Sequence, residues 1–239
     1  MIRRPPRSTQ SRSSAASDVY KRQGHLHLIL QQLAINADCV LDLHTAGVAT
    51  RYLYAPEYLA ERSSALPFPF HLIIGDKFGG SMDEAAFITW VNLRNIFSDL
   101  GRVFRIDFES YTLELGGEER ISIKEASKDL EYILEYLSHK GLTPISETKP
   151  EYKIIKCSKK DYKSYFAKQA GLYDFIAKPG QLIKKGDLLA IGINFENYFS
   201  EKSIKFKVLA NEDCIVLTHY PSSSVLQGSE IYQVMEKFY

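Results

Sequence analysis

Two short segments of this 239-residue sequence carry side chains whose types and spacing suit chemistry. The first is Asp42-Leu43-His44-Thr45, which follows the apolar run that begins at Cys39. A histidine at the end of a buried strand can present a neutral imidazole nitrogen to a metal ion. Because side chains alternate along a strand, Asp42 and His44 are expected on the same face. A single histidine near a strand end is also typical of a hydrogen-bonded structural residue, so the spacing alone leaves both interpretations open.

The second segment lies seventy residues further on and reads Tyr111-Thr112-Leu113-Glu114-Leu115-Gly116-Gly117. Glu114 is the single acid among strand-forming residues, just before a Gly-Gly turn. A carboxylate in a partly desolvated site has a raised pKa, which is what a general base requires. The alternative is an ordinary glutamate at a strand end.

The elements that must position these residues alternate between strands and helices, which predicts an α/β layer domain. Apolar periodicity predicts helices over 25–36 (buried), 82–99 and 123–139, the last with its apolar face at 126, 130, 133, 134 and 137. Strands are predicted over 39–43 (buried), 72–74, 103–108 and 110–115. Glycines at 101 and 141 are placed to end the second and third helices.

The composition shifts near 143–152, which we interpret as a linker. Short β-prone runs then follow at 152–157, 171–176, 188–193, 204–208, 214–217 and 231–234. The prediction is therefore the C-terminal part of a mixed-sheet α/β catalytic domain over 24–145, followed by a small all-β domain over 146–239.

Composition narrows the function classes. The formal net charge of +1 gives no reason to expect nucleic acid or a membrane surface as partner. No apolar run is long enough for a membrane helix. Three widely spaced cysteines give no disulfide framework, and a cytoplasmic location is the simpler expectation. A homo-oligomer remains possible.

Taken together, the strand ending ADCVLDLHT and the later strand YTLELGG resemble the succinylglutamate desuccinylase/aspartoacylase family, within the zinc carboxypeptidase-like superfamily. The resemblance covers residues 24–239. It implies a Zn²⁺ cofactor, with His44 as the second zinc-binding histidine and Glu114 as the catalytic glutamate. It also implies hydrolysis of an amide bond in a small N-acyl amino acid or related compound, by metal-activated water.

The sequence departs from the family pattern in one respect. None of its histidines is followed three residues later by glutamate, whereas the family takes its other two zinc ligands from an upstream His-x-x-Glu pair. The upstream Asn-Arg substrate-binding segment of the family is also missing. Residues 1–23 are rich in Arg and Ser and resemble translated sequencing-adapter sequence, with a native tail or transit peptide as the alternative. The expectation is a disordered, non-native segment joined to a truncated enzyme that is inactive as written.

Weaker candidates complete the site prediction. Asp42 could orient a ligand as its hydrogen-bond partner, and Arg51, Asn92 and Arg94 could bind a substrate carboxylate, since arginine suits that group. Each is more often a surface or salt-bridging residue. Two other functions stay open, a carboxypeptidase-like peptide hydrolase and a non-catalytic binding or assembly protein without the metal site.

Overall fold

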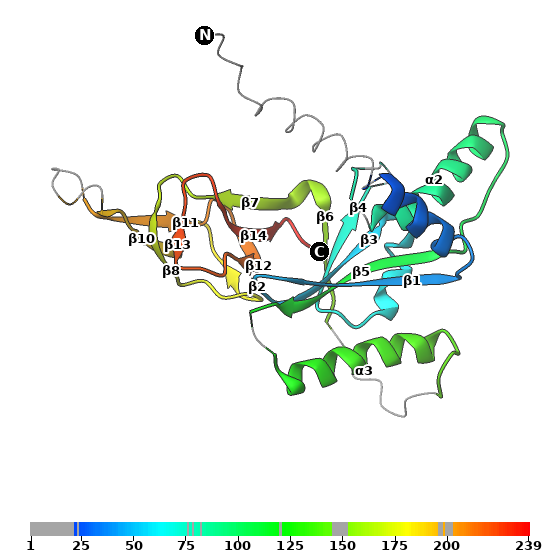
Figure 1. Ribbon diagram of the computed structural model, residues 1–239, viewed down its shortest axis with the longest axis horizontal. Coiled ribbons are helices and arrows are strands. Elements are labelled where there is room, and N and C mark those ends of the chain that lie inside the picture. Colours follow the sequence, from blue (N-terminus) through cyan, green and yellow to red (C-terminus); the bar gives the residue numbers. More distant parts are fainter. Residues whose placement is uncertain are drawn as a thin grey trace, which may run out of the picture. The chain divides into compact units, whose positions relative to one another are not determined.

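The computed structural model describes residues 22, 24–75, 77, 79–81, 83–119, 121–144, 153–195, 198 and 203–239 (Figure 1). The predictions for residues 1–23 and most of the 143–152 linker lie outside these residues. The chain forms two compact units, a smaller one within 1–40 and 76–110 and a larger one within 41–75 and 111–239. Among the described residues, no helix is both long and apolar enough to cross a membrane.

The smaller unit contains two helices. Residues 24–34 are helical, and α2 (Glu84–Asp99) ends in a turn at Gly101, whose φ of +67° suits glycine. Both helices agree with the sequence prediction, but the first is not buried. Leu28 and Leu33 are exposed, and Ala34 is the buried residue of this helix. The predicted strand over 103–108 is also wrong, because residues 102–108 have no regular structure although Ile106 and Phe108 are buried.

A five-stranded mixed sheet supplies the framework of the larger unit, in the order β1-β5-β3-β4-β6. Its strands are β1 (Cys39–Ala46), β3 (Arg51–Pro56), β4 (Phe70–Ile74), β5 (Glu109–Gly117) and β6 (Ile155–Ser158). The 3-10 helices η1 (Glu57–Leu59) and η2 (Arg62–Ala65) link β3 to β4, which pair in parallel, whereas β3 and β5 are antiparallel. β1 was predicted as a buried strand, but it lies at the edge of the sheet, so Leu43 remains 54% exposed.

Helix α3 (Ile123–His139) begins and ends where the sequence predicted. Ser122 caps it by accepting a hydrogen bond from the Glu125 amide, and Gly141 follows its end with a φ of +74°. The predicted apolar face is wrong, because Leu130 and Leu134 are exposed. The buried side chains are those of Asp129, Tyr132 and Tyr136. Tyr136 meets Tyr111 of β5 edge to face, at 5.9 Å between ring centroids, so α3 packs on the sheet through its tyrosines.

The remaining strands form two antiparallel sheets, in the orders β11-β10-β8-β13 and β2-β12-β14-β7. They are β2 (Val48–Ala49), β7 (Tyr162–Phe166), β8 (Gly171–Phe175), β9 (Leu182–Ile183), β10 (Leu188–Ile193), β11 (Lys205–Leu209), β12 (Cys214–His219), β13 (Ser224–Val225) and β14 (Glu230–Glu236); the 3-10 helix η3 (Lys159–Asp161) precedes β7. Five of the β-prone runs predicted after residue 170 are therefore strands. The mixed α/β character with extra antiparallel sheets is confirmed.

The separation into an α/β domain and an all-β domain at residue 145 stays a prediction. β6, which follows that boundary, pairs in parallel with β4 and so belongs to the mixed sheet. A shared core also joins the two regions. Tyr52, Leu72 and Cys157 of the mixed sheet pack with Leu217 and Met235 of the antiparallel strands.

Candidate functional site

The two motifs predicted to carry chemistry lie on neighbouring strands, β1 and β5. The Glu109 amide donates to the Asp38 carbonyl (3.1 Å), and the Glu118 amide donates to the Ala46 carbonyl (2.9 Å), so the two strands run in the same direction. His44 and Glu114 both lie toward the C-terminal ends of these strands. Parallel neighbours bring such ends to one edge of a sheet, which is where α/β proteins place their ligand sites.

Close backbone packing fixes how the two motifs meet beyond these ends. A Cβ at Gly117 would lie 2.9 Å from the Gly47 carbonyl oxygen, so the Gly-Gly turn after Glu114 rests directly on the chain that follows His44. A Cβ at Gly47 would in turn lie 3.0 Å from the ring of Pro221. Gly117 is required by the close approach of a backbone oxygen, whereas a Cβ at Gly47 would press on a proline ring. Neither contact could be predicted from the sequence.

His44 and Asp42 form the imidazole–carboxylate pair of the site. Alternation along β1 puts them on the same face, as predicted, and His44 Nε2 lies 3.0 Å from Asp42 Oδ2. The side chains remain 44% and 36% exposed, so water competes for this contact. A carboxylate that accepts from one imidazole nitrogen fixes the tautomer and leaves the other nitrogen to a ligand. The role of Asp42 as an orienting partner stays a prediction.

Glu114 is the buried acid of the site, only 8% exposed. It pairs with Tyr52 across the antiparallel β3–β5 ladder, so both side chains lie on the same face of the sheet. Tyr54 and Tyr162 follow on this side, with hydroxyl oxygens 3.5 Å apart. Burial first, and then the neighbouring phenol of Tyr54, raise the pKa of Tyr52 and Tyr162, with a smaller contribution from Glu114, so both phenols stay protonated at neutral pH. The sequence analysis missed these tyrosines, although the alternation of Tyr52 and Tyr54 in β3 was a signal.

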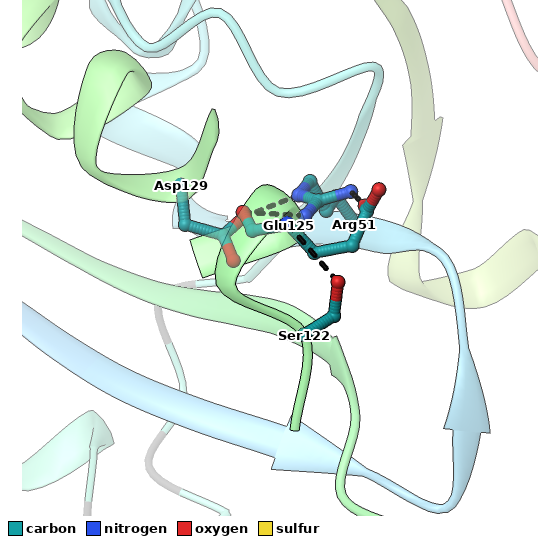
Figure 2. Close-up of polar contacts among 4 residues, drawn as sticks. All are labelled: Arg51, Ser122, Glu125 and Asp129. Carbon is teal, nitrogen blue, oxygen red and sulfur yellow. Dashed lines mark hydrogen bonds and ion pairs between the residues drawn. The ribbon is translucent and has the colours of Figure 1, made fainter. Parts of the chain in front are cut away.

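Arg51 is held by helix α3 (Figure 2). Its Nε donates to Asp129 Oδ1, one terminal nitrogen donates to Glu125 Oε2 at 2.6 Å, and the other donates to the Glu125 carbonyl at 3.0 Å. Burial acts to lower the pKa of Arg51, but the hydrogen bonds to Asp129 and Glu125 outweigh it and raise that pKa. The same contact lowers the pKa of Glu125.

The register of β3 and β5 separates Arg51 from Glu114. Arg51 pairs with Leu115, the next residue after Glu114, and neighbouring residues of a strand point to opposite faces. Arg51 therefore lies on the face covered by α3, and Glu114 lies on the face that packs against the antiparallel strands. The structure does not bring these two predicted residues together. A substrate-binding role for Arg51 would require its ion pairs to break.

Asn92 and Arg94 belong to α2, in the smaller unit, whereas His44 and Glu114 belong to the larger one. Asn92 is exposed and Arg94 is partly exposed. Their proposed contact with a substrate carboxylate stays a prediction.

The donor set of the described residues does not fit the zinc ion that the family resemblance implies. Among them, no group of three or more His, Cys, Asp and Glu side chains is placed to hold a metal ion. His44 contributes one imidazole and Asp42 lies against it, whereas a catalytic zinc takes three protein ligands and water.

A small cavity of about 170 Å³ adjoins the end of β1. Its walls include Ala46 and Gly47, together with residues of β12 and β14 such as His219, Glu230 and Tyr232. His219 is stacked on Phe175 at 4.7 Å between ring centroids, and burial lowers its pKa, so it is a neutral imidazole near pH 7. Strand β12 reaches this place because it pairs with β2, directly after the first motif. This pairing of distant segments left no signal in the sequence.

These features define a class, a mixed-sheet α/β protein in which an imidazole–carboxylate pair and a buried glutamate lie on neighbouring parallel strands. No protein-family model matches the sequence, and no curated protein matches it. Solved structures do match.

A succinylglutamate desuccinylase/aspartoacylase protein from Shewanella frigidimarina is 37% identical, with a TM-score of 0.80 over 87% of this chain and 56% of that one. A family member from Shewanella amazonensis is 30% identical, with a TM-score of 0.77 over 100% of this chain and 72% of that one. A third, from Rhodobacter sphaeroides, shares the fold at 21% identity, with a TM-score of 0.63 over 88% of this chain and 61% of that one. The chain therefore belongs to the succinylglutamate desuccinylase/aspartoacylase family, and it spans little more than half the length of the first of these relatives.

Proposed function

We propose that this protein is built for amide-bond hydrolysis, removing an acyl group from a small N-acyl amino acid or related compound. Membership of the desuccinylase/aspartoacylase family is the observation that carries the proposal. The placement of His44 and Glu114 at the ends of adjacent parallel strands supports it. Both groups reach the site from rigid strands, which holds them more precisely than loops would.

In this proposal Glu114 moves the proton. Its carboxylate accepts a proton from the attacking water, and the water oxygen bonds to the amide carbonyl carbon. When the carbon–nitrogen bond breaks, Glu114 returns the proton to the leaving amine. Burial on the tyrosine side of the sheet suits this exchange, because a partly desolvated carboxylate holds a proton more readily than one in water.

The incomplete donor set leads to a separate expectation for this chain. With His44 and Asp42 alone, it should bind zinc weakly and hydrolyse N-acyl amino acids at a negligible rate. Equilibrium dialysis against micromolar zinc, followed by elemental analysis, measures the first. Stoichiometric zinc that is lost in His44→Ala would show that the ligand set is complete after all.

The hydrolase proposal itself is tested in a chimera, because the chain matches only 56% of the Shewanella frigidimarina protein. The part of that relative which the chain does not match is fused ahead of residue 24. N-succinylglutamate and a panel of N-acyl amino acids are then assayed for amine release. Glu114→Gln should lower kcat by about 10²–10⁴-fold. Glu109→Gln, a change of another buried glutamate of the same strand, should lower it far less.

A folded chimera that hydrolyses none of the panel would contradict the proposal. So would turnover that survives Glu114→Gln. Either result would favour a binding or assembly role on this fold. Turnover of peptides in preference to N-acyl amino acids would instead favour the carboxypeptidase-like alternative.

A further inference from the structure

One cavity of the antiparallel strands has no part in the proposed hydrolysis. It has a volume of about 440 Å³, within the range of small-molecule sites. Its lining includes Tyr165, Lys168, Tyr173, Phe206, Lys207 and Val208. Most come from β7 and β11 or from the residues just after them. Neither His44 nor Glu114 is among them.

The cavity lies between two strands that each end a sheet. β7 is the last strand of one antiparallel sheet, and β11 is the last strand of the other. Among the described residues, β7 pairs only with β14 and β11 pairs only with β10. The space between these edges is therefore not closed by strand pairing, and side chains determine what it can hold.

Hydrogen bonds and ring contacts hold the walls of the cavity in place without a ligand. The backbone amide of Asn211 donates to the Tyr165 hydroxyl at 2.8 Å, which ties the chain after β11 to β7. The Tyr173 hydroxyl donates to the Gln169 carbonyl at 2.7 Å, which ties β8 to the chain after β7. Tyr173 also meets the ring of Phe206 edge to face, at 5.4 Å between centroids. Such preorganisation lowers the entropy cost of binding.

The charged residues that line the cavity are all positive. Lys168 and Lys207 are its charged residues, both of them exposed, and no acidic residue occurs in the lining. Glu212, next to Asn211 in the sequence, is paired elsewhere, because its Oε1 lies 2.9 Å from Lys185 Nζ. The inner wall is aromatic and aliphatic, from Tyr165, Phe206 and Val208 among others. An anion can therefore face the ammonium groups while a planar apolar body lies against the rings.

We propose that this cavity is a second binding site, for a small organic anion that carries a carboxylate on a planar or branched apolar body. It lies on the antiparallel part of the protein, between the edges of two sheets. The lysines select for charge, and the tyrosine and phenylalanine rings select for shape.

Three probes with one ring system test the assignment on the full 239-residue chain: 2-naphthoate, 2-naphthylmethanol and 2-naphthylmethylamine. Isothermal titration calorimetry and saturation-transfer NMR measure their binding. We expect 2-naphthoate to bind at least tenfold more tightly than the alcohol, and the amine to bind least. Equal affinities, or no binding of 2-naphthoate up to millimolar concentration, would overturn the proposal.

Two variants locate the binding. Lys168→Met with Lys207→Met should weaken 2-naphthoate by tenfold or more and leave the alcohol unchanged. Val208→Phe should weaken both, because it fills the cavity and keeps the charge. The control is Lys205→Met, a lysine of the same strand outside the lining, which should change neither affinity. Thermal melting confirms that each variant is folded.

Two results would contradict the proposal. If Lys205→Met weakens 2-naphthoate as much as the double variant does, the binding reflects general surface charge and the proposal fails. An uncharged extended peptide, N-acetyl-trialanine amide, serves as competitor. If it displaces 2-naphthoate or binds in its place, the two sheet edges are recognising a strand, and the site is not one for small anions.

Discussion

His71 should make the protein lose stability on mild acidification. It lies in β4, inside the mixed sheet, with no exposed surface, and its Nδ1 is 3.0 Å from the Ser63 hydroxyl oxygen. Burial first, and then the positive charge of Lys156 on the neighbouring strand β6, lower the pKa of His71 to about 3. The imidazole is therefore neutral in the folded protein at every pH in which the protein is normally handled.

The size of the effect follows from the difference between the folded and unfolded pKa values. In the unfolded chain the histidine pKa is about 6.5, so between pH 6.5 and pH 3 the unfolded state binds one proton that the folded state does not. Stability therefore falls as pH falls through this window, by about 1.4 kcal/mol per pH unit once the pH is well below 6.5. Between pH 7 and pH 5 the loss from His71 is about 2 kcal/mol.

The assay is urea unfolding followed by far-UV circular dichroism at pH 7, 6 and 5. The variant His71→Leu removes the titrating group, and Ser63 keeps a partner because its hydroxyl also donates to the Ala60 carbonyl at 2.9 Å. His71→Leu should lose about 2 kcal/mol less than the wild type between pH 7 and pH 5. His139→Gln, at the exposed end of α3, should keep the wild-type dependence.

His219 also has a lowered pKa and adds a loss of the same sign, which is present in both proteins and cancels in the comparison. The reasoning is refuted if the wild type and His71→Leu lose the same stability between pH 7 and pH 5. That outcome would mean that the buried imidazole is protonated in the folded state, with its charge balanced by a group not identified here.

Two further sets of variants test how α3 and the antiparallel strands are held, each by urea unfolding at pH 7. Asp129→Asn should cost about 2–3 kcal/mol because it leaves the largely buried Arg51 guanidinium without its buried partner, whereas Glu125→Gln, at a half-exposed carboxylate, should cost less than about 1 kcal/mol; equal costs would contradict this assignment. Gly171→Ala should cost more than about 3 kcal/mol, because a Cβ there would lie 2.3 Å from a backbone oxygen of β10. Gly186→Ala, where a Cβ meets nothing within 4 Å and only the positive φ is strained, should cost about 1–2 kcal/mol, and a cost as large as that of Gly171→Ala would show that backbone strain dominates both.

The sequence predicted the elements that depend on local signals. Helix α3 illustrates this best, because Ser122 begins it and Gly141 follows its end, as capping chemistry requires. The prediction of the buried face of α3 was wrong because contacts with other segments determine that face, and helical periodicity does not report such contacts. Asp129 is buried because its carboxylate pairs with Arg51 of β3, and Tyr132 is buried against Phe68 at 5.4 Å between ring centroids. A prediction based on apolar residues alone places such polar and aromatic side chains on the solvent-exposed face.

The predictions of a buried strand over 39–43 and of a strand over 103–108 were wrong for a related reason. The run from Cys39 to Leu43 is apolar enough for an interior strand, yet β1 lies at the edge of the sheet. Residues 102–108 carry Val103, Ile106 and Phe108 but form no strand. A strand requires a partner as well as a pattern, and the sequence of one segment does not say which neighbours the fold supplies.

The candidate site shows what the sequence could and could not predict about function. His44 and Glu114 were predicted from the two motifs and the family resemblance, and the fold places their strands side by side. The alternation of side chains along β3 and β5 separates the predicted site residues onto two faces of the sheet, which the motifs alone did not show. On the face of the sheet that α3 covers, Arg51 forms ion pairs that hold the helix. On the opposite face Glu114 lies with Tyr52, where no ion pair to Arg51 can form. The register of β3 and β5 therefore places the ion pairs that hold α3 on one face and the residue of the proposed chemistry on the other. A substitution that shifted β5 by one residue would exchange the two faces.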